Sequence, residues 1–224
     1  MFRERLIPYG FLTQLHCPPM IYQERALKEL YLDLSDRFQY RKFELLSPGQ
    51  GAILREGEAR SCEIYRDRMV VKEQPTALAF EDYLDQLQPI VESVQRALRI
   101  PVWIVQQAVL RFLVPMDVPA APLVRSQLFN LPDEVLGRFG RPVLGLCLRI
   151  EFPPLPDEPT QMQLRVEPYF KTADANTLFI ELSTRFLQPL QTAEELRPRL
   201  SRADEFVKDK ALAFLEETLS PRSS

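Results

Sequence analysis

The chain has 224 residues, of which 46% are apolar and 26% are charged, a composition typical of globular proteins. Its formal net charge of -3 and isoelectric point near 5.4 argue against a nucleic-acid-binding protein, which needs clustered Lys and Arg to displace counterions from phosphate. Its longest apolar runs fall short of the roughly 20 residues of a membrane-spanning helix, and its start lacks a secretory signal, so we expect a cytoplasmic protein.

In chain order, the first expected element is an amphipathic helix within residues 21–38. Its apolar side chains recur at helical spacing on one stripe, with charged side chains opposite; they are Leu27, Leu30, Tyr31, Leu34 and Phe38. Residues 41–73 then change to short β-rich runs separated by glycines at 49, 51 and 57. This pattern is typical of a meander of antiparallel strands.

A second amphipathic helix is expected at 79–98, and Pro89 should kink it or split it in two. A long strand follows at 101–115, and its even-numbered residues form the more consistently apolar set. Its other face carries Trp103, Gln107 and Arg111.

The last third of the chain predicts short helical pieces around 123–139 and then three strands. We expect these strands at 143–153, 161–170 and 177–187. A final helix is expected at 201–219, where Ser201 with Asp204 can form a capping box. Residues 220–224 are expected to be a flexible tail.

Strands in local runs, with helices between the runs, indicate an α+β fold: an antiparallel β-sheet with amphipathic helices packed on one face. We expect a single domain over residues 1–219, with a candidate internal boundary at 115–132. The two halves could be related as strand-helix-strand modules, but no residue-level repeat supports this.

The reactive residue types give few signs of catalysis. Cys17, Cys62 and Cys147 are too widely spaced for a disulfide framework or a metal pair, so we expect reduced, buried thiols. His16 is the only histidine, and on a strand it would point away from its neighbour Cys17, which opposes a Cys-His dyad. The seven glycines form no phosphate-binding loop. We therefore predict no metal site and no cofactor.

The three late strands carry a repeated tetrapeptide, Leu-Arg-Ile-Glu at 148–151 and Leu-Arg-Val-Glu at 164–167. Each strand has one apolar side, and opposite charges facing each other across strands are favourable. We therefore predict that Arg149 faces Glu167 and that Glu151 faces Arg165. Glu181 of the third strand is expected to face Arg165 from its other side.

These charges have two interpretations. Exposed pairs contribute only about 0 to 1 kcal/mol each, so they could simply specify strand pairing on a solvated face. Alternatively, they line a groove in which an arginine holds a carboxylate or phosphate. The candidate binding residues are Arg111, Arg149, Glu151, Arg165, Glu167, Glu181 and Arg185.

The sequence favours a non-catalytic protein that binds a protein partner or a small acidic ligand on this charged face, and not a nucleic acid or a membrane. The alternative is an enzyme that uses Arg and Glu side chains, such as Glu151 and Glu181 as acid and base, with Cys62 or Cys147 as further candidates. A third hypothesis is a structural subunit of an assembly, with an exposed apolar patch around Trp103 or 116–131. The hairpin tip at 153–159 could also present a rigid edge to a partner.

Two short motifs, Cys-Glu-Ile-Tyr-Arg-Asp-Arg-Met-Val-Val at 62–71 and Ala-Val-Leu-Arg-Phe-Leu-Val-Pro at 108–115, resemble those of a sporadically distributed, uncharacterised bacterial family of about this length. The chain departs from that family at Lys72-Glu73, where a tryptophan would be expected, and at Val114-Pro115. The resemblance implies interest in Asp67, Arg68 and Arg111, but it implies no activity.

Overall fold

The computed structural model describes residues 2–171 and 175–219. One nine-stranded antiparallel sheet runs through the molecule in the order β2-β3-β4-β5-β1-β6-β9-β8-β7. The strands are β1 (Ile7–His16), β2 (Lys42–Leu45), β3 (Gly51–Glu56), β4 (Arg60–Tyr65), β5 (Arg68–Glu73), β6 (Val105–Pro115), β7 (Leu148–Phe152), β8 (Thr160–Pro168) and β9 (Thr177–Phe186).

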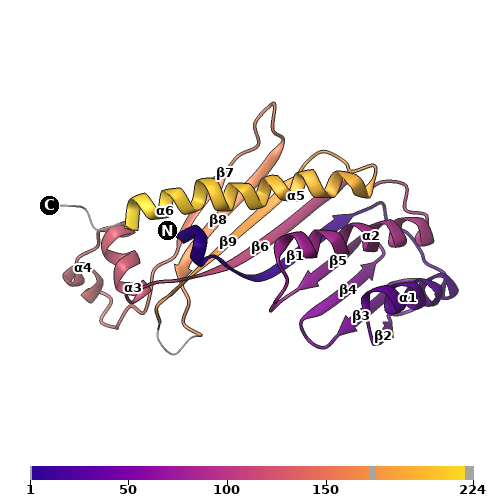
Figure 1. The fold of residues 1–224 in the computed structure, drawn as a ribbon, viewed down its shortest axis with the longest axis horizontal. Helices are drawn as coiled ribbons and strands as arrows, with labels where there is room; N and C mark the ends of the chain where they lie inside the picture. The colour runs from indigo at the N-terminus through magenta and orange to yellow at the C-terminus, as the bar shows by residue number, and fades with distance from the viewer. Residues whose placement is uncertain (1, 172–174, 220–224) are drawn as a thin grey trace.

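The principal helices lie on one face of this sheet, as the α+β prediction requires (Figure 1). They are α1 (Glu24–Phe38), α2 (Phe80–Leu98), α5 (Leu196–Glu205) and α6 (Leu212–Leu219). The π-helical segment η4 (Phe206–Ala211) joins α5 to α6, and we call the continuous stretch 196–219 the C-terminal helix. Three short helical segments lie at the end of the molecule opposite α1 (Figure 1). They are α3 (Ala120–Leu123), the π-helical η2 (Val124–Phe129) and α4 (Asp133–Gly137).

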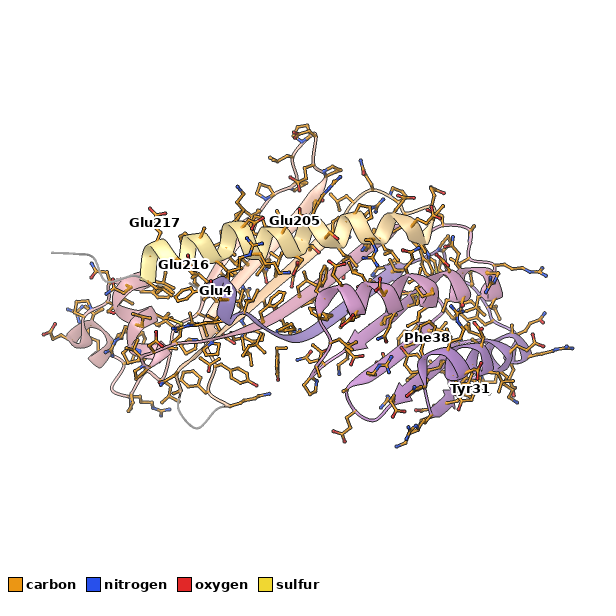
Figure 2. All side chains as sticks on the ribbon, in the orientation of Figure 1. Glu4, Tyr31, Phe38, Glu205, Glu216 and Glu217 are labelled. Carbon is orange, nitrogen blue, oxygen red and sulfur yellow. The ribbon has the colours of Figure 1, made fainter. Side chains whose placement is uncertain are left out.

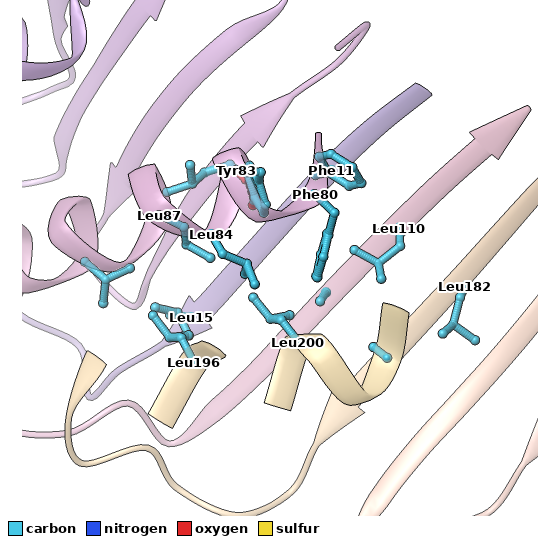
Figure 3. Close-up of a cluster of buried hydrophobic side chains, with 14 of the residues drawn as sticks. Phe11, Leu15, Phe80, Tyr83, Leu84, Leu87, Leu110, Leu182, Leu196 and Leu200 are labelled. Carbon is cyan, nitrogen blue, oxygen red and sulfur yellow. Dashed lines mark hydrogen bonds between the residues drawn. The ribbon is translucent and has the colours of Figure 1, made fainter. Parts of the chain in front are cut away.

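The hydrophobic core lies between the sheet and these helices. Alternate strand residues such as Phe11, Leu110 and Leu182 point toward the helices and are almost fully buried. Leu84 of α2 and Leu200 of α5 meet them from the other layer (Figure 3). The alternation predicted for the late strands is confirmed, because Leu178, Ile180, Leu182 and Thr184 are all buried. The opposite side of the sheet, pointing away from the helices, is called the open face.

The order of elements is the same in the two halves of the chain. In the first half β1 is followed by α1, by the meander β3-β4-β5 and by α2. In the second half β6 is followed by α3, by the meander β7-β8-β9 and by the C-terminal helix. Since β1 and β6 pair antiparallel at the centre of the sheet, a pseudo-two-fold axis between them relates β5 to β9, β4 to β8 and β3 to β7. Among the strands that the structure describes, only β2 has no counterpart in this scheme.

Several local predictions were wrong. Helix α2 is continuous from Phe80 to Leu98 with Pro89 inside it, so of the two predicted effects of the proline the split is wrong and the kink stays a prediction. Trp103 is fully buried and bridges to Leu190, which removes it from any exposed patch. The C-terminal helix begins before residue 201, because Thr192 and Glu195 form the capping box that was predicted for Ser201 and Asp204.

The predicted register of the β7-β8 hairpin was also wrong. Arg149 faces Arg165, and Glu151 faces Gln163, so the hairpin is shifted by two residues from the predicted pairing. Both registers keep the apolar side chains toward the helices, and exposed ion pairs are too weak to choose between them. The predicted pairing of Arg165 with Glu181 on β9 is confirmed.

The tail prediction for residues 220–224 lies outside the described residues. Among the helices that the structure describes, none is both long and apolar enough to span a membrane.

Candidate binding surfaces

All seven candidate residues of the charged face lie on the open face of the sheet, on β6, β7, β8 and β9. This shared placement follows from strand alternation, since the apolar neighbours of each residue point to the helices. Arg111 lies on β6, Arg149 and Glu151 on β7, Arg165 and Glu167 on β8, and Glu181 and Arg185 on β9.

Most of these charges are bound to one another. The Arg111 Nε lies 2.7 Å from a Glu181 carboxylate oxygen, and Arg165 donates to both oxygens of Glu167 at 2.7–3.2 Å. Gln163 donates to Glu151 at 2.5 Å. These contacts leave little of the ionic surface available to hold a ligand.

Arg111 belongs to a polar cluster that the sequence did not reveal. Its guanidinium also donates to Gln74, whose side chain packs against Gly10. Nearby, a hydrogen bond from Tyr169 is the main cause that lowers the pKa of Tyr9, while burial raises the pKa of Tyr169 to about 12. Residues 9, 74, 111 and 169 come from separate strands and loops, so only the register of the folded sheet brings them together.

Arg185 differs from the paired arginines. It is exposed, has no ion-pair partner among the described residues, and lines a hollow of about 230 Å³ on the open face. Polar side chains from β6, β8 and β9 share this hollow, namely Gln107, Gln161, Gln163 and Ser183, and Glu151 of β7 also lines it. The hollow therefore combines the Arg185 guanidinium and the Glu151 carboxylate with amide and hydroxyl groups.

His16 lies close enough to Arg185 for the charge of Arg185 to lower the pKa of the His16 imidazole. Burial is the largest cause that lowers the pKa of His16; the Asp67 carboxylate, the next cause in size, raises it, and the charges of Arg68 and then Arg185 lower it. Arg149, also exposed and without an ion-pair partner in the described part of the chain, lies on the edge strand β7.

The family-like motif forms a tight β4-β5 turn. Asp67 lies in this turn and pairs with Arg68 at 3.0 Å, and the Arg68 guanidinium stacks 4.5 Å from the Tyr65 ring centre. The backbone oxygen of Asp67 accepts a hydrogen bond from the Cys17 amide. In the structure these residues therefore hold the turn and the end of β1 together.

Cys17 and Cys62 are poorly suited to nucleophilic chemistry, because the thiolate is the reactive form and burial disfavours it. Cys62 is fully buried, and burial raises its pKa to about 12. Burial also raises the pKa of Cys17. Cys147 is exposed, contrary to the expectation of buried thiols. Among the described residues, no group of three His, Cys, Asp or Glu side chains could hold a metal ion.

A second candidate binding surface lies on the helix-covered side of the sheet, and sequence analysis did not predict it. A groove of about 590 Å³ runs between the C-terminal helix and strands β7 and β8. Its walls are apolar, and Phe152 meets Phe206 edge to face with ring centres 5.2 Å apart. Other lining residues include Ile150, Met162, Leu155 and Phe214. We call this cavity the apolar groove.

The rim of the apolar groove carries charge. Arg202 and Lys210 of the C-terminal helix line it on one side, and Glu158 of the β7-β8 loop lines it on the other. Neither Arg202 nor Lys210 forms an ion pair within the residues that the structure describes. The outer side of the same helix carries exposed acids instead, among them Glu205 and Glu217 (Figure 2).

Comparison with known proteins supplies no relative from which a role could be carried over. No family model matches the chain, and no curated protein matches it. Among solved structures, the S. pombe Pct1 RNA triphosphatase aligns over 99% of this chain and 88% of that chain at 9% identity, with a TM-score of 0.13. A likeness this weak carries no argument about fold or function.

Proposed function

We propose that the chain is a non-catalytic cytoplasmic binding protein that recognises an acidic group on its open face. The acidic group would belong to a protein partner or to a small ligand. The observation that carries the proposal is Arg185, an exposed cation that has no ion-pair partner within residues 2–171 and 175–219 and lies beside a polar hollow. A guanidinium binds a carboxylate through two parallel hydrogen bonds, which gives such a site both affinity and orientation.

The size of the hollow supports a small acidic group. Its volume of about 230 Å³ is below the roughly 300–1,000 Å³ of sites that enclose drug-sized ligands. One carboxylate, with a few atoms attached, fits this space. Gln107 and Ser183 could then bind the atoms beyond the carboxylate, because amide and hydroxyl groups both donate and accept hydrogen bonds.

The single histidine provides a direct test. Burial is the main cause that lowers the pKa of His16, and the charge of Arg185 lowers it further; a bound anion offsets that charge, so binding should raise the pKa. We would follow the His16 ring by NMR while titrating pH, with and without saturating succinate or a pentaglutamate peptide. The chain has only one histidine, so its signal is unambiguous.

Two variants complete the test. Arg185→Ala should abolish the response of His16 to the anion, whereas Arg149→Ala, which removes an exposed arginine that does not line the hollow, should preserve it. The proposal fails if neither probe moves the pKa of His16, or if the response survives in Arg185→Ala.

A further inference from the structure

The two halves of the molecule differ at one equivalent position. In the first half, α1 lies beside α2 over β3 and buries Leu27, Leu30 and Leu34. The pseudo-two-fold axis carries this position to the space beside the C-terminal helix over β7 and β8, which is where the apolar groove lies. The segment that follows β6 contacts α6 and β8 at the end of the molecule instead.

We propose that the apolar groove binds an amphipathic helix of a partner protein, in the manner in which α1 packs on the first half. This helix would present apolar residues at spacings of three and four, with acidic residues on the flank that faces Arg202 and Lys210. The site lies on the opposite side of the sheet from the acid-binding hollow, and it stands independently of the proposed function.

The length of the groove agrees with this occupant. Arg202 and Lys210 are eight residues apart, which is roughly 12 Å along a helix. Leu27 and Leu34, at the ends of the buried stripe of α1, are seven residues apart, or roughly 10 Å. Two helical turns of a partner therefore match the distance between the two basic residues.

The lining suits a helix that inserts side chains. Phe152, Phe206 and Phe214 offer large apolar surfaces, and Met162 has the flexible side chain of a surface that adapts to its ligand. Phe206 and Lys210 belong to the π-helical segment of the C-terminal helix, and such segments often mark functional sites. An apolar groove that receives side chains at helical spacing is an established mode of peptide recognition.

The charge on the rim indicates the orientation of the partner. Arg202 and Lys210 lack carboxylate partners among the described residues, so acidic side chains of a bound helix would meet unpaired cations. On the opposite rim Glu158 would favour a basic residue. These contacts are partly exposed, so they select a partner more than they hold it.

The test uses two display libraries of 18-residue peptides with the same composition. In one, Leu, Ile, Phe and Met occupy a stripe at positions i, i+3, i+7 and i+10, and in the other their positions are scrambled. The full chain is the target. We expect binders from the striped library, enriched in Asp and Glu on one flank. Equal enrichment from the scrambled library would overturn the proposal.

Variants locate the binding. Phe214→Glu alters a rim residue that is already 38% exposed, and it should weaken the selected peptides about tenfold or more. Leu32→Glu makes the same kind of change at a 66% exposed position of α1 and should leave binding unchanged. Arg202→Glu combined with Lys210→Glu should reverse the preference from acidic to basic flanks. Peptides that bind Phe214→Glu and the wild type equally would refute the assignment.

Other occupants of the groove give different results. Palmitate that binds more tightly than the best peptide and displaces it would identify a site for an apolar acid and would overturn the proposal. A dimer seen by sedimentation equilibrium, and lost in Phe214→Glu, would identify a second copy of the chain and would also overturn it. The NMR response of His16 reports only on the open face, so failure there and failure here are separable.

Discussion

Arg60 and Glu73 form an ion pair on the helix-covered side of the sheet, with the Arg60 Nε 2.8 Å from the carboxylate. Arg60 also donates to Gln86 of α2 and stacks over the Tyr40 ring. Glu73 is only 9% exposed, and burial raises its pKa above the ordinary 4.5 despite the nearby arginine. Sequence analysis did not predict this pair, because in the sequence the two residues look like ordinary surface charges.

The raised pKa of Glu73 predicts a pH dependence of stability. The folded protein binds this proton more strongly than the unfolded chain does. The contribution of Glu73 to the free energy of unfolding is therefore most favourable below pH 4.5 and declines as the pH rises through the raised pKa. Glu73→Gln cannot titrate, so the stability of the wild type relative to this variant should fall from about pH 4.5 upward. Urea unfolding of both proteins across that range measures the difference, and a relative stability that rises with pH would contradict the assignment.

Gly51 illustrates a constraint of the backbone. Its φ is +130°, and a Cβ there would lie 1.9 Å from the carbonyl oxygen of Ile64 on β4. We expect Gly51→Ala to lower the free energy of unfolding by about 3 kcal/mol, because strain and a backbone clash add together. Gly57 has φ +59° and open space around it, so Gly57→Ala should cost only about 1 kcal/mol. Equal costs, measured by urea unfolding, would show that the clash at Gly51 is relieved.

At the scale of elements, the β7-β8 hairpin shows that the charge pattern of two strands does not predict their register. Alternation predicted which side chains face the helices, because burial of Leu164 and Val166 is worth far more than any exposed ion pair. It could not predict the register, since a shift of two residues keeps every side chain on its face. Arg165 is bound along its own strand by Glu167, so Arg149 remains opposite it as a like charge.

This like-charge pair predicts a stabilising substitution. Arg149→Glu places a carboxylate opposite Arg165 and should raise the free energy of unfolding by about 0.5 kcal/mol at low salt. The gain should shrink at high salt, because exposed charges are screened. The control Arg185→Glu faces Gln107 and Gln161 and should change stability little. A loss of stability in Arg149→Glu at low salt would argue against the register.

Periodicity predicted the helices, but it did not predict where they end or whether other elements cover all of their apolar side chains. The stripe of α1 is correct, and Leu27, Leu30 and Leu34 are buried as expected. In the C-terminal helix, Phe214 is 38% exposed and lies at the rim of the apolar groove. Periodicity identifies the apolar side of a helix, but it cannot tell whether another element covers all of that side.

At the scale of the molecule, sequence analysis raised a relation between the two halves but could not support it, because the repeated order of elements is topological. The two halves share no repeated residues, yet they share central strands, meanders and closing helices. The α+β class and the layer of helices on one face were predicted from local runs of strands. The pairing of β1 with β6, which joins the halves, involves residues about 100 positions apart and has no local signal.

The central pairing predicts a gradient of hydrogen exchange across the sheet. Amides of β1, β6 and β9 lie between two neighbours under the core, so they should open only with global unfolding and exchange slowest. Amides of the short edge strands β2 and β7 should exchange by local opening and much faster. Native-state hydrogen exchange by mass spectrometry measures this, and a slow first half beside a fast second half would instead indicate two units that unfold separately.

The pairing of β1 with β6 joins two halves of one polypeptide, and this determines how the two halves can differ. Two identical subunits that joined through such a seam would present identical surfaces, so both grooves would be filled or both would be open. Because one polypeptide supplies both halves, each half can carry its own helix arrangement. The first half can thus serve as a closed scaffold while the second exposes its apolar side, at the same moment and in every molecule.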